Sequence, residues 1–389
     1  MSDDPLRLII AGGGTGGHVL PALAVMEELR ARDLAFQPLW IGSTTGVERE
    51  SAQRAGIPYQ AIATGKLRRY LSIQTPVDAA RIPLGAVQAW KHVRRHRPHV
   101  VLSTGGFVSV PTVLAASRLA PVLTHEQTAI LGLATRLNAR LAEVLAVSYD
   151  ETAAVAASRH QRVVVTGNPV RASLRLGDAS RGRAQFGFTE GLPLLYVTGG
   201  ARGATPLNER IAALLPNLLH QCQILHQTGP ASANANAAHL ARLRHNLPEP
   251  LRSRYHVVEF VRDELPDVYA ATDLVLSRAG AGTVAELAYL GKPAVLIPLP
   301  GAGGDEQTRN GRILAEAGAA ILLPQDEATP ERLREMLGSL VGDRKRLEDM
   351  GQRAQRIGRP DAAARLADEL LRLARWNNRD LTPGQHSPG

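Results

Sequence analysis

Residues 277–310 decide the fold of this chain, and they begin Ser277-Arg278-Ala279-Gly280-Ala281-Gly282-Thr283-Val284-Ala285-Glu286. The apolar run at 273–276 before them is short and bounded, which is typical of a buried parallel strand. The small residues then allow a tight turn into a helix that we expect to open near Thr283, with backbone N–H groups facing outward. Gly291 predicts the end of that helix, and residues 294–298 predict the next strand. The stretch therefore predicts a βα unit with an anion site at the helix N-terminus.

Glu286 has two interpretations. Thr283 and Glu286 have the spacing of a capping box, in which both side chains satisfy helix N–H groups. A carboxylate one turn into a helix that holds a diphosphate also suits ribose hydroxyls. Gln307 and Asn310, one helical turn apart after the next strand, add amides that can bind sugar hydroxyls. Residues that can bind phosphate, ribose and sugar, in this order along the chain, indicate a site for a nucleotide-sugar.

The totals describe a globular protein of two domains. The chain has 389 residues, a length that exceeds one ordinary hydrophobic core. Its composition, 44% hydrophobic and 21% charged, is typical of a soluble globular protein. One cysteine, Cys222, excludes an internal disulfide and favours the cytosol. We expect no signal peptide, because the first residues are acidic, and no apolar stretch is long enough to span a bilayer. The charge of +9 suits anionic partners, but an aromatic content of only 4% argues against nucleic acid.

A second glycine turn lies near the start of the chain. Residues 6–11 predict a strand, and Gly12, Gly14 and Gly17 follow it with the spacing of a dinucleotide fingerprint, before a helix that we expect near Pro21. A dinucleotide site also needs an acidic residue at the end of the second strand, 38–41, to hold the ribose. Gly42 and Ser43 stand there instead, and Glu48 lies beyond, which weakens the NAD interpretation.

His18, at the edge of this turn, is the candidate catalytic residue. A histidine at a helix entry is commonly hydrogen-bonded to nearby backbone. At the edge of a glycine turn, however, it faces whatever that turn binds, and its ordinary pKa suits a general base near neutral pH.

Strands and glycine turns alternate along both halves of the chain. Residues 99–104 predict a strand that enters Gly105-Gly106, and residues 121–124 predict one that carries residues 125–128 to the same edge. The second half restarts with a strand at 194–198 followed by Gly199-Gly200. Because open α/β sheets bind ligands at the carboxyl ends of their strands, both halves predict a site at that edge. The fold class is α/β, and the second half echoes the first, as though two similar α/β sheets follow each other.

A helix expected at 82–97 carries Leu84, Val87, Trp90 and Val93 on one side, with Lys91 and several arginines nearby. Such a stripe is usually a core face. The alternative is docking on acidic lipid, with Trp90 at headgroup depth and a basic surface extended by Lys66, Arg68 and Arg69.

The ordered motifs resemble one family over nearly the whole chain. They are Gly13 to His18, Gly105-Gly106-Phe107, His125-Glu126-Gln127, Gly167 to Arg171, Gly199-Gly200 and Ser277 to Glu286. The set resembles the MurG family of bacterial transferases, which move GlcNAc from UDP-GlcNAc to lipid I, undecaprenyl-pyrophosphoryl-MurNAc-pentapeptide, and so form lipid II in peptidoglycan synthesis. The resemblance implies the GT-B architecture, in which two Rossmann-like doubly wound parallel-sheet domains face a cleft. It also implies a peripheral protein that binds an anionic membrane surface at the cytoplasmic face of the cell membrane.

The same resemblance implies roles for individual positions. His18 matches the proposed base, Arg171 lies by the diphosphate, Val261 by the uracil and Gln307 by the GlcNAc hydroxyls. Two further groups are implied to contact substrate: Thr15, Gly16 and Gly17 between donor and acceptor, and Ala281, Gly282, Thr283, Val284, Ala285 and Glu286 around phosphate and ribose. Two positions depart from the family pattern. Thr128 replaces an Asn, which puts one amide contact to the donor in doubt. Ala201-Arg202 replaces Ser-Gln and removes a hydroxyl, and charge on Arg202 would compensate.

The implied domains are an acceptor and membrane domain at 1–168, joined by a C-terminal helix at 358–376, a donor domain at 169–357, and a disordered tail at 377–389. We expect an inverting displacement in which His18 deprotonates the C4 hydroxyl of MurNAc. No DxD-like pair follows a strand, so neither a metal ion nor another cofactor is expected. Another UDP-sugar enzyme of the same architecture, an epimerase or hydrolase, remains an alternative, and an NAD-dependent oxidoreductase is a weaker one.

Overall fold

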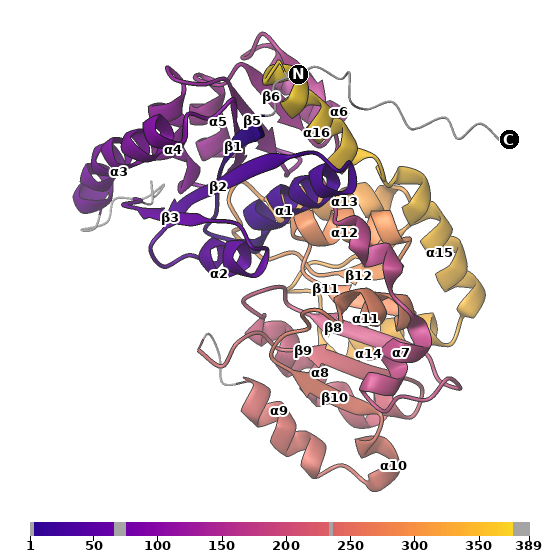
Figure 1. The fold of residues 1–389 in the computed structure, drawn as a ribbon. Coiled ribbons are helices and arrows are strands. Elements are labelled where there is room, and N and C mark those ends of the chain that lie inside the picture. The colour runs from indigo at the N-terminus through magenta and orange to yellow at the C-terminus, as the bar shows by residue number, and fades with distance from the viewer. Residues whose placement is uncertain (1–3, 66–74, 233–235, 376–389) are drawn as a thin grey trace, which may run out of the picture. The chain divides into compact units, whose positions relative to one another are not determined.

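The computed structural model describes residues 4–65, 75–232 and 236–375, and the chain divides into two compact units (Figure 1). The first unit holds Met1–Arg171 and Asp361–Gly389, and the second holds Ala172–Pro360. Lys66, Arg68 and Arg69, which we expected to extend a basic surface, lie outside the described residues, as does the expected tail at 377–389.

The first unit is built on a parallel sheet. Its strands, within the described residues, are β1 (Leu6–Gly12), β2 (Phe36–Ser43), β3 (Tyr59–Ile62), β4 (Val100–Gly105), β5 (Val122–Glu126), β6 (Val144–Val147) and β7 (Val163–Val165). Their order is β3-β2-β1-β4-β5-β6-β7, and each neighbouring pair is parallel. The order reverses direction between β1 and β4, the point at which such sheets bind ligands.

Alternation along β1 explains the two layers of helices on this sheet. Leu8 and Ile10 belong to a buried cluster with Met26 of α1 and Leu370 of α16, whereas Ile9 belongs to a second cluster with residues of α3 and α4. Successive side chains of a strand point to opposite faces, so an uninterrupted apolar strand requires cover on both. The helices are α1 (Gly16–Ala31), α2 (Val47–Arg54), α3 (Thr75–His96), α4 (Ser109–Ala116), α5 (Leu133–Ala139), α6 (Asp150–Ala157) and α16 (Ala362–Leu373).

Two expected helix starts were wrong for the same reason. We expected helices from near Pro21 and from residue 82, next to Pro83, but α1 begins at Gly16 and α3 at Thr75. Proline is favoured at the first position of a helix, where its missing N–H has no partner to lose. Both prolines lie inside their helices instead, and the glycine turn therefore leads directly into α1.

The second unit repeats the arrangement of the first. Its strands, within the described residues, are β8 (Leu194–Thr198), β9 (Gln223–Gln227), β10 (Tyr255–Val258), β11 (Leu274–Ser277), β12 (Ala294–Leu296) and β13 (Ala320–Leu322). The order is β10-β9-β8-β11-β12-β13, again parallel throughout, with the reversal between β8 and β11. The prediction of two doubly wound parallel sheets is confirmed.

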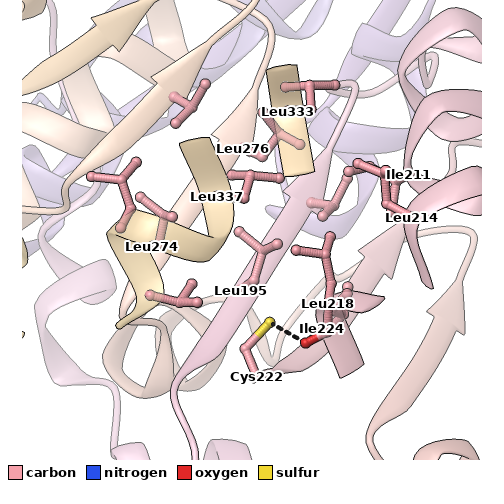
Figure 2. Packing of buried hydrophobic residues seen from close by; sticks show 14 of the residues in the cluster. Leu195, Ile211, Leu214, Leu218, Cys222, Ile224, Leu274, Leu276, Leu333 and Leu337 are labelled. Atoms are coloured by element: carbon pink, nitrogen blue, oxygen red, sulfur yellow. Dashed lines mark hydrogen bonds between the residues drawn. The ribbon is translucent and has the colours of Figure 1, made fainter. Parts of the chain in front are cut away.

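The core of the second unit lies between its sheet and a layer of helices that includes α8 (Thr205–Leu219) and α14 (Pro330–Val341) (Figure 2). Figure 2 shows Leu195, Leu274 and Leu276 of the strands in one cluster with Ile211 of α8 and Leu337 of α14. Each fully buried side chain of this kind contributes about 1.5–3 kcal/mol to stability. Cys222 lies in the same core, where burial raises the pKa of its thiol to about 12 and makes it unreactive at neutral pH.

The remaining elements of the second unit complete both layers. They are η1 (Ala172–Leu176), α7 (Ala179–Gln185), α8 (Thr205–Leu219), α9 (Asn236–His245), α10 (Glu249–Arg252), α11 (Leu265–Ala271), α12 (Ala281–Leu290), α13 (Glu306–Glu316), α14 (Pro330–Val341) and α15 (Arg344–Ile357). Gly291 has φ 67°, so the predicted end of α12 is confirmed, although the helix begins two residues before Thr283.

The C-terminal helix is shorter than expected. Residues 358–376 were predicted to form it, but α15 ends at Ile357 and α16 spans only Ala362–Leu373. Arg32, the C-cap residue of α1, donates hydrogen bonds to Asp368 and to the carbonyl of Ala364, which holds α16 against α1. Among the described helices, none has the length and apolar content that crossing a bilayer requires.

Candidate active site

The glycine turn of the first unit is packed tightly against its neighbours. A Cβ atom added to Gly12 would lie 2.0 Å from Thr104 Oγ1, and one added to Gly13 would lie 2.4 Å from Glu48. Gly14 has φ +86°, a conformation that other residues rarely adopt, and Thr15 then serves as the N-cap residue of α1. The turn therefore requires glycines because of its close contacts with this chain, before any ligand is considered.

Glu48 connects this turn to the end of β2. The carboxylate is fully buried; its Oε2 accepts from Gly14 N (3.0 Å) and its Oε1 accepts from Ser43 N (2.9 Å). In a dinucleotide-binding domain, the turn binds the pyrophosphate and the second strand carries the acid that binds the ribose. Here one carboxylate of the chain already occupies the Gly14 N–H and the end of β2. A bound dinucleotide would have to displace it, which further weakens the oxidoreductase alternative.

His18 is the third residue of α1 and lies between two turns of the first unit, the turn at Gly12–Gly14 and the turn at Gly105-Gly106. Its Nδ1 is 3.1 Å from the carbonyl oxygen of Thr104, at the end of β4, and 3.1 Å from Gln127 Oε1. A Cβ atom on Gly106 would lie 3.0 Å from His18 Cδ2, so the imidazole depends on the absence of a side chain there. Because both neighbours of Nδ1 are acceptors, Nδ1 carries the proton in the neutral ring and Nε2 keeps a lone pair. That lone pair is what a general base requires.

Residues 125–128 differ from the expectation that all four reach the ligand edge. His125, Glu126 and Gln127 are at most 2% exposed, because β5 continues through Glu126 and keeps these side chains inside the unit. Glu126 accepts hydrogen bonds from the N–H groups of Gly132 and Thr128, and the Thr128 hydroxyl lies 2.8 Å from the same carboxylate. The His125-Glu126-Gln127 motif is therefore buried and bonds to the segments that surround the site, and of the four residues only Thr128 is partly exposed.

Arg171 lies at the end of the first unit, after Gly167, whose φ is +86°. The side chain is half-buried, and its Nε is buried without a hydrogen-bond partner among the described residues. A buried guanidinium N–H without an acceptor is costly, so an anion at this position would satisfy it.

The turn at Gly280–Gly282 in the second unit is open, whereas side chains of this protein fill the space around the Gly12–Gly14 turn of the first unit. Gly280 is the N-cap residue of α12, and Val284 is the residue whose N–H donates back to the Gly280 carbonyl. The earlier amides, including those of Gly282 and Thr283, belong to the first helical turn, which has no preceding turn to receive them. Cβ atoms added to Gly200, Gly280 or Gly282 would meet nothing closer than 4.0 Å. The turn therefore offers donors and open space to an anion.

The capping-box interpretation of Glu286 is wrong. The N-cap residue is Gly280, so Thr283 and Glu286 lie inside α12 and do not cap it. Glu286 is 9% exposed, and its Oε2 accepts from the Tyr269 hydroxyl of α11 (2.9 Å). A phenol that holds one carboxylate oxygen orients the group, and the sequence contained no signal for Tyr269.

The amides expected to bind sugar together are separated by burial. Gln307, in the first turn of α13, is partly exposed, and its Oε1 accepts from Leu299 N (2.9 Å). Asn310 is 1% exposed, and its Nδ2 lies 3.4 Å from the Ala279 carbonyl, which suits a structural role below the turn. Gln307 stays a candidate for sugar binding, and Asn310 is less suited to it.

The two remaining candidates lie at the carboxyl ends of other strands. Ala201 is exposed in the turn after β8, whereas Val261 follows β10 and is 9% exposed. Val261 N donates to Gln227 Oε1 (2.9 Å), so the Val261 N–H is already bonded within the chain. Arg278, beside the α12 turn, is also committed: its Nη1 donates to the carbonyls of Ile297 and Pro298, and burial lowers its pKa.

Two Rossmann-like parallel sheets, one in each unit, are the fold of the class of GT-B glycosyltransferases. Residues 8–147 match the glycosyltransferase family 28 N-terminal domain, and residues 194–366 match the glycosyltransferase family 28 C-terminal domain. The chain belongs to this family, and within it to the MurG family.

Relatives of the full length support this assignment. A protein of Listeria monocytogenes named UDP-N-acetylglucosamine--N-acetylmuramyl-(pentapeptide) pyrophosphoryl-undecaprenol N-acetylglucosamine transferase is 37% identical over 373 residues, which cover 95% of this chain and 99% of that protein. A protein of the same name from Treponema denticola is 35% identical over 390 residues, covering 96% and 99%. The crystal structure of Acinetobacter baumannii MurG superimposes with a TM-score of 0.68 at 30% identity, over 95% of this chain and 100% of that one.

The fold alone extends to other enzymes. A UDP-GlcNAc 2-epimerase from Neisseria meningitidis has a TM-score of 0.65 at 16% identity, covering 94% of this chain and all of that one. Such a match shows a shared fold only. The distinction between transferase and epimerase therefore comes from the sequence identity to named transferases, and it favours the transferase.

Proposed function

We propose that this protein transfers GlcNAc from UDP-GlcNAc to the C4 hydroxyl of MurNAc in undecaprenyl-pyrophosphoryl-MurNAc-pentapeptide, with inversion at the anomeric carbon. The observation that carries this proposal is the 37% identity over 95% of the chain to a protein named for that transfer. The geometry of each unit supports one half of the reaction.

The second unit would bind the donor. The N-terminus of α12 supplies amides and about half a positive charge for the diphosphate, and Arg171 adds a charged donor. Glu286, oriented by Tyr269, would accept from the ribose hydroxyls. Val261 would lie by the uracil and Gln307 by the GlcNAc hydroxyls. Ala201, in the open turn after β8, would lie near the phosphates.

The first unit would supply the base and the acceptor site, with Thr15, Gly16 and Gly17 near the reacting groups and Thr128 beside them. His18 Nε2 takes the proton from the MurNAc C4 hydroxyl while the new O4–C1 bond forms. The bond from C1 to the diphosphate oxygen breaks in the same step, and its electron pair leaves with UDP. The helix N-terminus and Arg171 stabilise the charge that develops on the leaving diphosphate.

A lipid-linked acceptor requires that the enzyme work at a membrane surface. On α3, Leu84, Val87 and Trp90 are 41–56% exposed, so the interpretation of this stripe as a core face was wrong for all but Val93. Arg94 lies over the Trp90 ring, 5.0 Å from its centroid. A solvent-facing apolar stripe beside exposed cations suits an anionic headgroup layer. We place the protein as a peripheral component of the cytoplasmic face of the cell membrane.

The reaction is tested by UDP release from UDP-GlcNAc, with and without a water-soluble lipid I analogue. A transferase releases UDP only when the acceptor is present. Release, or conversion of the sugar, in its absence would identify a hydrolase or an epimerase instead.

Membrane docking is tested separately by sedimentation with vesicles that contain anionic phospholipid. Leu84→Ser should weaken binding several-fold, because it removes apolar area from the stripe. Leu176→Ser is the matched control, since Leu176 is 78% exposed in the second unit. Equal effects of the two substitutions would refute the assignment of α3 as the docking surface.

A further inference from the structure

We propose that Gln127 is a positioning residue for the transfer reaction: its amide oxygen holds the proton of His18 on Nδ1 and stabilises the imidazolium that forms when Nε2 accepts the acceptor's proton. This inference rests on the proposed function. Gln127 is 1% exposed and comes directly after β5, so it lies beneath the glycine turns and does not contact substrate itself.

The orientation of the Gln127 amide follows from its neighbours. Its Nε2 is 2.8 Å from the Thr104 carbonyl oxygen and 3.2 Å from the His125 carbonyl oxygen. Two carbonyl oxygens cannot both face an amide oxygen, so the NH2 group must be on this side. The oxygen of the amide therefore faces His18 Nδ1, at 3.1 Å.

The His125 ring supplies a further acceptor to the same NH2 group. Its Nε2 lies 2.9 Å from the Gly167 carbonyl, which makes Nε2 the protonated nitrogen and Nδ1 the acceptor. Gln127 Nε2 lies 3.1 Å from that Nδ1. Burial is the main cause that lowers the pKa of His125, to about 4, so this acceptor stays unprotonated at neutral pH.

In the series of hydrogen bonds that joins Gly167, His125, Gln127 and His18, the donor and the acceptor of each bond are thus fixed. The Thr104 carbonyl oxygen is a second acceptor for the His18 Nδ1 proton, but it also accepts a hydrogen bond from the Gln127 NH2 group. Gln127 therefore supplies one acceptor to His18 with its amide oxygen and competes for the other with its NH2 group. A base whose Nδ1–H is held in this way presents Nε2 to the acceptor and is stabilised once charged, as a second group does for the histidine of hydrolytic triads.

Titratable groups near His18 include Glu48, whose carboxylate is bonded to Gly14 in the same turn, and His125 and Glu126 on β5. Glu48 is bonded to Gly14 and Ser43, and Glu126 to Gly132 and Thr128, so both carboxylates are committed elsewhere. In the described structure, Gln127 is the side chain bonded to His18 Nδ1.

Two substitutions test this role because they should move the same titration in opposite directions. Gln127→Glu places a carboxylate beside Nδ1, stabilises the imidazolium and should move the acid limb of the kcat profile up by about one pH unit or more. Gln127→Leu removes the acceptor and should move that limb down by about half a unit or more, with a kcat loss of about tenfold or more and a KM for UDP-GlcNAc within about twofold.

The matched control is Gln88→Leu, because the Gln88 amide oxygen also accepts one hydrogen bond within the first unit, from the Ala63 N–H and not from His18. It should leave the profile in place when a water-soluble acceptor is used. The titration of His18 can also be followed by 15N NMR, with its signal assigned as the one lost in His18→Asn. The His18 pKa should be highest in Gln127→Glu and lowest in Gln127→Leu, and this measurement does not rely on activity. If Gln127→Leu fails to fold, the upward shift in Gln127→Glu decides.

Shifts in the same direction, or no shift in either variant, would overturn the role of Gln127. A fall in kcat without a shift would also overturn it, since that result indicates a structural role only. Wild-type protein that transfers no GlcNAc at any pH would instead refute the proposed function, and the NMR titration would still decide the role of Gln127.

Discussion

Gly106 offers a direct perturbation of the candidate base without changing any polar group. Its φ is +75°, and a Cβ atom added there would lie 2.3 Å from the Gly13 carbonyl oxygen and 3.0 Å from His18 Cδ2. Ordinary van der Waals contact begins at about 3.4 Å, so Gly106→Ala requires a displacement on the order of 1 Å in the glycine turn or the imidazole. A misplacement of this size costs about 100-fold in rate.

The matched control is Gly56→Ala in the same unit. Gly56 has φ +67°, and nothing lies within 4 Å of an added Cβ atom, so only backbone strain remains. That strain is about 1–2 kcal/mol, offset by about 0.4–1 kcal/mol from the stiffer unfolded chain. Gly56→Ala should therefore lower Tm by a few degrees and leave kcat unchanged.

The assay is acceptor-dependent UDP release at saturating donor, together with thermal unfolding of both variants. Gly106→Ala should lose about 100-fold in kcat with little change in the affinity for UDP-GlcNAc, since the donor would be bound by the other unit. Full activity in Gly106→Ala, or an equal loss in Gly56→Ala, would refute the reasoning that the space around Gly106 positions His18.

Three further predictions concern single carboxylates and one buried histidine. Glu286→Gln should weaken UDP-GlcNAc binding roughly tenfold or more in calorimetry, because a charged acceptor is lost, whereas exposed Glu316→Gln should not; equal affinities would remove Glu286 from the donor site. Glu48→Gln should cost about 1–3 kcal/mol in denaturant unfolding, because an NH2 group must face the N–H of Gly14 or Ser43; exposed Glu50→Gln on the same helix is the control, and a cost no larger than its own would contradict the bracing role. Burial lowers the pKa of His226 to about 3, so the unfolded chain binds the extra proton below about pH 6.5, and stability present above that pH is lost as the pH falls. Between pH 6.5 and 4.5 the wild type should lose up to about 1.4 kcal/mol per pH unit more than His226→Gln, and parallel curves would contradict this.

The sequence allowed the fold class to be predicted because its signals are local. Apolar runs such as that of β11, followed by glycine turns, indicate parallel strands that feed helices, and Gly291 marked the end of α12 correctly. The helix starts at Gly16 and Thr75 were missed because proline is a start signal only when no earlier turn forms. The exposed stripe on α3 has the same period as a core face, and periodicity does not reveal which side faces solvent.

The contacts that organise the site were not predictable, because they join residues far apart in the sequence. His18 and the residue that holds its proton, Gln127, are 109 positions apart, and Gly14 and Glu48 are 34 apart. Tyr269, which orients Glu286, stands in a helix without any motif. The glycine turns after β1, β4, β8 and β11, by contrast, were predictable from local sequence, because each follows directly on an apolar strand.

The most direct measurement is the transfer of radiolabelled GlcNAc from UDP-GlcNAc to a lipid I analogue by the wild type and by His18→Asn. We predict a labelled lipid-linked disaccharide with the wild type. With His18→Asn we predict a kcat lower by about 100-fold or more, at a dissociation constant for UDP-GlcNAc within about twofold. Absence of labelled lipid with the wild type would contradict the proposed reaction, and equal turnover in the variant would contradict the role of His18 as its base.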